Sequence, residues 1–201
     1  NMKGIDLKAG ALTMNEKSAL TYNVKLKNRD YYKQDSNAYL TNFIDEINAS
    51  FNYSTTFSNK VKGEYSYYVE GLLKTSVENE NQSILNRDIY KSEVKKESID
   101  GNILNLSDDF LIDVEEYKKM YDELLSNYRL NLNGELFFHV VITYNVFDEV
   151  IEKSINQKAE LTLQFPIDQE TTTIKTSPDK ENVFREYKET PSEHESIYFV
   201  I

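Results

Sequence analysis

Apolar and polar residues alternate along several stretches of the chain, and a period of two is typical of β-strands that turn one face toward a core. In residues 20–27 polar side chains separate the four members of an apolar face, which are Leu20, Tyr22, Val24 and Leu26. The pattern predicts a strand whose other face is exposed to water.

Residues 47–57 and 61–71 form two more alternating runs, separated by the short polar segment 58–60. Two such runs around a polar turn predict a β-hairpin. The many Tyr and Phe side chains in these runs favour ordinary cross-strand packing, and a platform that stacks on a sugar or peptide ligand is the alternative. Gly63 and Gly71 lie inside the second run, where glycine indicates a bulge or a close approach between backbones.

Strand-like patterns continue through the second half of the chain. They predict further strands at residues 83–98, 101–107, 134–147, 158–167 and 171–177. The run from Phe137 to Val141 is apolar on both faces, as in a central strand that is covered on both sides.

The apolar period changes from two to three or four residues at only one place, which predicts an amphipathic helix at about 113–127. Asp113 followed by Glu116 resembles a capping box at its start. Glu115 and Lys119 form a supportive pair one helical turn apart. The apolar face of the helix consists of Val114, Tyr117, Tyr121, Leu124 and Tyr128.

Seven or eight strands with one helix predict a mainly β fold, an antiparallel β-sandwich-like domain. We expect this domain to span residues 1–176. Residues 177–201 are rich in charged and polar residues, and we expect them to form a polar tail or linker that leads toward a membrane anchor outside this chain.

Composition and charge exclude several functions. With 201 residues, 39% of them hydrophobic and 28% charged, the chain is long and apolar enough to fold around a core. Residues 1–100 carry 14 acidic and 14 basic side chains and residues 101–201 carry 20 and 9, so the second half accounts for the net charge of −11. Such a surface repels phosphates, which argues against nucleic acid as a partner and against docking on an anionic membrane. The absence of cysteine excludes disulfides, thiolate metal sites and cysteine nucleophiles.

Catalytic and metal-binding patterns are scarce. The two histidines are His139, within a hydrophobic strand, and His194, in the polar tail. A transition-metal site normally needs two or more His or Cys ligands close together, so we interpret His139 as a buried, hydrogen-bonded core residue. The chain also lacks a G-x-S-x-G nucleophile elbow and a glycine-rich phosphate loop. We therefore expect no catalytic residue, no cofactor and no enzymatic activity.

Acidic residues gather just before and inside the predicted helix. Asp108, Asp109 and Asp113 are the candidates for a calcium site, because calcium prefers carboxylate oxygens. The spacing of an EF-hand loop is missing, however, and acidic residues also favour helix N-termini because of the helix dipole. Glu115 and Glu116 complete the group, which could supply the two opposed carboxylates of a glycosidase only if it converges in a cleft.

Three stretches between Thr21 and Thr75 read "TYNVKLKNRDYY", "YLTNFIDEINASFNYSTTFS" and "GEYSYYVEGLLK". They are similar to domain-of-unknown-function family 5305, a family of membrane-anchored proteins of bacteria and archaea. A looser similarity continues through "IDVEEYKKMYDELLSNY" and "LFFHVVITYNV", so the resemblance spans about residues 20–165. It carries no catalytic signature, and no residue inherits a role from it.

The resemblance implies an extracytoplasmic domain at the cell membrane, held by hydrophobic anchors that are absent from this chain. We expect a non-enzymatic interaction, adhesion or scaffold module whose partner is another cell-surface protein or polymer. A hydrolase that acts on cell-surface polymers through the clustered carboxylates is the alternative, and it predicts two convergent acids with displaced pKa values in a pocket.

Overall fold

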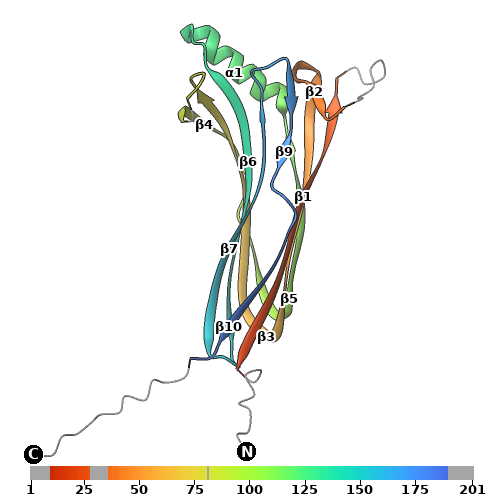
Figure 1. Cartoon of the computed structure of the whole chain (residues 1–201), viewed down its shortest axis with the longest axis vertical. Helices are drawn as coiled ribbons and strands as arrows, with labels where there is room; N and C mark the ends of the chain where they lie inside the picture. Colours follow the sequence, from red (N-terminus) through yellow and green to blue (C-terminus); the bar gives the residue numbers. More distant parts are fainter. Residues whose placement is uncertain (1–9, 28–35, 81, 190–201) are drawn as a thin grey trace, which may run out of the picture.

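The computed structural model describes residues 10–27, 36–80 and 82–189. Within these residues, eight strands form one antiparallel sheet that folds into two layers, and a single α-helix lies across one end of the elongated molecule (Figure 1). The prediction of a mainly β, sandwich-like fold with one helix is therefore confirmed.

The main sheet has the strand order β10-β1-β3-β6-β7-β9, with β4 and β5 also paired to β3, while β2 and β8 form a separate pair. The strands are β1 (Ala11–Leu26), β2 (Ala38–Leu40), β3 (Ile44–Ser76), β4 (Ser83–Lys91), β5 (Lys95–Ile112), β6 (Asn133–Asp148), β7 (Lys153–Pro166), β8 (Thr171–Thr173), β9 (Lys175–Thr176) and β10 (Lys180–Tyr187). The helices are the 3-10 turn η1 (Thr41–Phe43) and α1 (Val114–Tyr128).

Strand β3 connects the two layers because it folds back on itself. A straight strand of its 33 residues would be about 110 Å long. The rings of Phe51 and Tyr67, sixteen positions apart, nevertheless lie 5.8 Å from each other. The first half of β3 pairs with β1, the second half pairs with β6, and β5 follows both halves.

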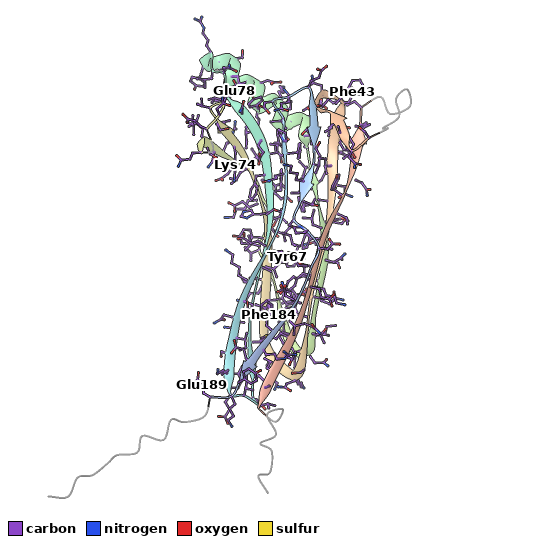
Figure 2. The ribbon with its side chains drawn as sticks, viewed as in Figure 1. Phe43, Tyr67, Lys74, Glu78, Phe184 and Glu189 are labelled. Carbon is purple, nitrogen blue, oxygen red and sulfur yellow. The ribbon has the colours of Figure 1, made fainter. Side chains whose placement is uncertain are left out.

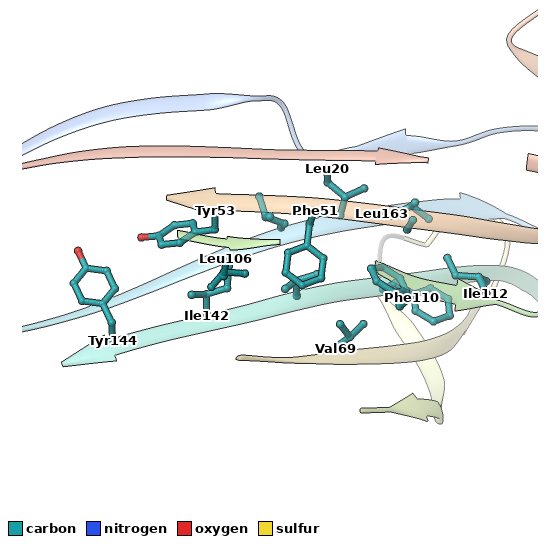
Figure 3. Close-up of a cluster of buried hydrophobic side chains, with 14 of the residues drawn as sticks. Leu20, Phe51, Tyr53, Val69, Leu106, Phe110, Ile112, Ile142, Tyr144 and Leu163 are labelled. Carbon is teal, nitrogen blue, oxygen red and sulfur yellow. The ribbon is translucent and has the colours of Figure 1, made fainter. Parts of the chain in front are cut away.

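The chain reversal predicted at residues 47–71 is therefore confirmed, but the predicted pairing of the two arms with each other is wrong. Its two arms lie in opposite layers and face each other across the core, instead of sharing a hydrogen-bonded ladder. Figure 3 shows Phe51 and Val69 pointing toward one another from the two halves of β3. The aromatic side chains of the two arms pack against each other between the layers, as the rings of Phe51 and Tyr67 do.

The polar turn between the arms attaches the fold-back corner to both layers. The backbone N–H of Thr13 donates to Ser58 Oγ at 2.8 Å. Asn59 Nδ2 donates to the Ala11 carbonyl at 3.0 Å and to Asp148 Oδ2 at 2.8 Å. Strand β5 turns at the same level, where Gly101 has a φ of 153°, a conformation that L side chains rarely adopt.

The core lies between the two layers and receives side chains from almost every strand. Its largest fully buried members are Tyr53, Phe51, Phe57, Phe138 and Phe165. Gly63 and Gly71 allow close packing here, as predicted. A Cβ on Gly63 would lie 1.9 Å from the Asn145 carbonyl oxygen of β6, and one on Gly71 would lie 2.4 Å from the Phe138 ring.

Helix α1 begins as its capping signal predicts. The Asp113 side chain accepts from the Glu116 backbone N–H at 3.0 Å, which caps the first turn. Arg129 follows the helix in the left-handed conformation that commonly ends helices. Tyr117 and Tyr121 bury the inner face against the sandwich. Glu115 forms an ion pair with Lys27 at 3.2 Å instead of the predicted pair with Lys119. The ion pair within the helix joins Lys118 to Asp122 at 2.8 Å.

The expectation of a polar tail from residue 177 missed a strand. Residues 180–187 form β10, which pairs with β1 from Ala11 to Ser18. This strand is mostly exposed, so its hydrogen bonds to β1 hold it in place, and the sequence there lacks an apolar alternation. Residues 190–201, including His194, lie outside the described residues.

Both ends of the described chain lie together at the end of the molecule that is opposite α1 (Figure 1). The backbone N–H of Lys188 donates to the Gly10 carbonyl at 2.7 Å. The antiparallel pairing of β1 with β10 brings these two residues to the same level.

Candidate functional site

The acidic residues proposed for calcium binding or catalysis point to different surroundings. Asp113 caps α1, and Asp109 is exposed on the outer face of β5. Asp108 points between the layers and bonds to Lys95 and Tyr67. Glu115 reaches Lys27. Within residues 10–27, 36–80 and 82–189, no group of three or more His, Asp or Glu side chains is arranged to hold a metal ion.

Asp108 joins the two halves of β5 across the open edge of the sandwich. Its Oδ2 accepts from Lys95 Nζ at 2.5 Å and from the Tyr67 hydroxyl at 2.8 Å. Burial by itself would raise the pKa of Asp108, but the hydrogen bonds from Lys95 and Tyr67 hold this pKa below its usual value. Tyr67 lies near the middle of the long axis (Figure 2), so this contact clamps the layers at mid-height.

We expect Asp108→Asn to lower the free energy of unfolding at pH 7 by about 1 kcal/mol, the size typical of partly exposed ion pairs. Because the folded-state pKa is lowered, the contribution of Asp108 is complete above the ordinary aspartate pKa of 3.8 and is lost as the pH falls through the folded-state pKa. Urea unfolding between pH 7 and pH 2.5 should therefore show the two proteins converging in acid. A constant difference over this range would contradict the assigned ion pair.

His139 lies on the outer face of β6, so its interpretation as a core residue is wrong. It is half-buried there, because the alternation of β6 turns its neighbours Phe138 and Val140 inward instead. Its Nε2 lies 2.9 Å from Glu70 Oε2, so the expected hydrogen bond exists. The apolar run made the face of His139 hard to predict, because Phe137 is also half-buried and lies on the same outer face as His139.

A row of side chains of different chemical types lies on the outer face of β3 and β6 and extends toward the end of the molecule that carries α1. Lys74 Nζ lies 4.0 Å from the centre of the Phe137 ring, and this ring lies 5.5 Å from the His139 ring. The His139–Glu70 pair continues the row. Lys74 lies close to the helical end of the molecule (Figure 2). Such a combination of a cation, an aromatic ring, an imidazole and a carboxylate offers several kinds of contact to a ligand.

The row ends in a cavity of about 360 Å³ that we call the upper cleft. Burial raises the pKa of Glu135 in this cleft, the nearby Lys74 and Lys175 oppose the rise, and Asp168 adds to it. A carboxyl group with a raised pKa next to a second acid is what general acid catalysis requires. The lining is otherwise polar and consists of Lys74, Thr75, Ser76, Ser83, Asn133, Gly134, Glu135, Pro166, Asp168 and Gln169.

The sequence analysis also missed a buried carboxylate. Glu16 points into the core from β1 and is only 8% exposed. The Tyr53 hydroxyl donates to Glu16 Oε2 at 2.5 Å, and Thr55 donates to the Tyr53 hydroxyl at 3.1 Å. Burial, followed by the bond to Glu16, raises the pKa of Tyr53. Glu16 follows the buried residues Leu12 and Met14 at a spacing of two, and this alternation in the sequence could have predicted that its side chain points inward.

Comparisons with known proteins add little to this description. No family model matches the chain, and no curated protein matches it. One solved structure, a protein from Archaeoglobus fulgidus, aligns with 72% of this chain and 94% of its own at 7% identity and a TM-score of 0.27. The likeness is too weak to support an argument about fold or function. No helix of the described residues is long and apolar enough to cross a membrane.

Proposed function

We propose that this chain is a non-enzymatic interaction module, displayed at the extracytoplasmic face of a bacterial membrane, where it binds another surface protein or polymer. The observation that carries the proposal is the hydrogen bond between Lys188 and Gly10, which holds both ends of the described chain at one end of a long domain. A domain that is tethered there presents α1 (Figure 1) and the upper cleft, to which Lys74 belongs (Figure 2), at its far end.

The length of the sandwich suits such a display. Strands β1 and β6, each of 16 residues, would extend over roughly 50 Å. Two long layers that pack closely on an aromatic core make a stiff spacer, because each layer resists the bending of the other. The resemblance to a membrane-anchored family supports the same arrangement.

Orientation on a surface tests the proposal, because the chain has no cysteine and a single one can be introduced at either end. Beads that carry the domain through Glu189→Cys keep the far end free, whereas beads that carry it through Asn127→Cys hide it. Cell envelopes from the native cells should bind saturably to the first beads and at least tenfold less to the second. Equal retention by both kinds of beads would contradict display from the end with Gly10 and Lys188.

The upper cleft supplies the specific observation for a hydrolase as the second candidate. Glu135 would act as the general acid, and Asp168 would be the second carboxylate. If the wild-type domain releases reducing ends from envelope polysaccharide and Glu135→Gln does not, the module is an enzyme and the first proposal fails. An unchanged release by Glu135→Gln would point to a contaminating activity instead.

A further inference from the structure

The second half of β5, residues 103–112, is a long and regular edge strand. It pairs with β3 from Thr56 to Ile47 without a register shift, and its other side pairs with no strand in the part of the chain that the structure describes. The segment reads "ILNLSDDFLI" and contains neither proline nor lysine, which commonly protect edges from pairing, and its charged residues are Asp108, which bonds to Lys95 and Tyr67, and Asp109. Such an edge is a template for one more strand.

The side chains of this edge strand separate into two rows. The inner row is buried in the core apart from Asp108. The outer row begins and ends with large apolar residues that are unusually exposed, Ile103 at 57% and Leu111 at 49%. Between them lie the polar residues Asn105, Ser107 and Asp109.

The outer row is symmetric about Ser107. If a second, antiparallel copy of the strand is placed against the first with Ser107 opposite Ser107, Ile103 lies opposite Leu111 of the other copy. Asn105 then lies opposite Asp109, so that its amide can donate to the carboxylate. Each cross-strand pair of the outer row is favourable, and the four apolar side chains lose their exposure to water.

We propose that this edge binds a second copy of the same chain through antiparallel strand addition centred on Ser107. The contact is isologous, because each copy offers the same surface and a two-fold axis passes between the two Ser107 residues. Among the described strands β4 also pairs on one side only, but it is shorter, it shifts register twice against β3, and it carries Arg87 and Asp88. The net charge of −11 opposes association, so salt should strengthen the pairing by screening.

Antiparallel pairing also fixes the directions of the two domains. Gly10 and Lys188 of one copy lie at the end of the complex where the other copy has α1. Two copies that are tethered at those residues can therefore pair only if their surfaces face each other. If the proposed display is correct, the pairing makes this module a homophilic adhesion domain that joins two surfaces.

Cysteine substitution tests the register. Under mild oxidation Ser107→Cys should give a disulfide-linked dimer with twice the 23.5 kDa chain mass. A mixture of Asn105→Cys and Asp109→Cys should cross-link at least tenfold faster than either variant alone. Ser50→Cys is the control, because Ser50 is also exposed but lies on β3, between β1 and β5. Equal rates for all these proteins would overturn the proposed edge pairing and leave the proposed function standing.

Charge exchange tests the energetics without touching the core. The double variant Ile103→Lys with Leu111→Lys places like charges opposite each other, as does Ile103→Glu with Leu111→Glu. Sedimentation at 1 mM chain and physiological salt should show each variant at least tenfold weaker in self-association than the wild type, and their mixture restored to heterodimers. Circular dichroism confirms that both variants are folded. A mixture that stays monomeric while the wild type dimerises would overturn the assigned register.

Beads coupled through Glu189→Cys test the bridging of two surfaces. Wild-type beads should aggregate, lysine-variant beads and glutamate-variant beads should each stay dispersed, and the two variants together should aggregate. If the domain dimerises in solution and the wild-type beads remain dispersed, pairing between facing surfaces is wrong. If the beads bridge while the orientation test with envelopes fails, the pairing is correct and the proposed display is wrong.

Discussion

Phe51→Ala is expected to lower the free energy of unfolding by about 3–5 kcal/mol, the usual cost of removing a buried ring. Phe51 is 1% exposed and touches both layers, since its ring lies 5.8 Å from Tyr67 and 6.5 Å from Phe110. The cavity cannot close easily, because its walls belong to two hydrogen-bonded layers. Urea unfolding followed by circular dichroism measures the loss.

Tyr68→Ala is the matched control for Phe51→Ala. Tyr68 belongs to the same strand, but it points to the outer face and is half-buried. Its removal should cost about 1 kcal/mol or less. Similar and small losses for both variants would show that the two arms of β3 do not face each other across a core.

Gly63→Ala is expected to destabilise the domain at or above the roughly 3 kcal/mol that marks the upper end of typical overpacking costs. The new methyl group would lie 1.9 Å from the Asn145 carbonyl oxygen and 2.8 Å from the Val146 Cα. Both atoms belong to the backbone of β6, which is hydrogen-bonded to β3 and cannot move aside alone. The melting temperature should fall accordingly.

Gly10→Ala is the control for the glycine substitution. Within the described part of the chain its new Cβ would meet only the Lys188 Cβ, at an ordinary contact distance of 3.5 Å. The free energy of unfolding should change by about 0.5 kcal/mol or less. If Gly63→Ala melted together with Gly10→Ala, the close approach of β3 and β6 would be refuted.

Elements with local signals were predicted well from the sequence. Helix α1 has a capping residue at Asp113 and an apolar face with the helical period, and both are properties of a few neighbouring residues. The strands around Leu20 and Leu161 alternate cleanly, because one face of each is in the core. The polar segment 58–60 reverses the chain for the same local reason.

Pairing partners and strand faces were predicted less well, because they depend on distant residues. Nothing within residues 47–71 tells whether the two arms share a ladder or face each other, since both arrangements bury the same aromatic side chains. His139 lies in a run with apolar residues on both faces, so its face could not be read from the period. Strand β10 depends on backbone bonds to β1, which leave no trace in the side-chain pattern.

The candidate sites show the same division. The acidic group from Asp108 to Glu116 was visible as a cluster in the sequence, but the strand-to-helix junction directs its side chains apart. Glu135 and Asp168 are 33 positions apart in the sequence, and the pairing of β6 with β7 brings them to one cleft. The symmetry of the outer row about Ser107 can be read from the sequence once the edge position of β5 is known.

The neighbouring positions of Gly10 and Lys188 also determine how the domain responds to force. A pull that separates these two residues opens the ladder between β1 and β10 one hydrogen bond at a time, like a zipper, and needs little force. A pull between this end and the proposed contact on β5 loads the β1–β3 and β3–β5 ladders along their length, so that many hydrogen bonds resist together. The same domain is therefore mechanically soft between its own ends and strong between this end and the proposed contact on β5.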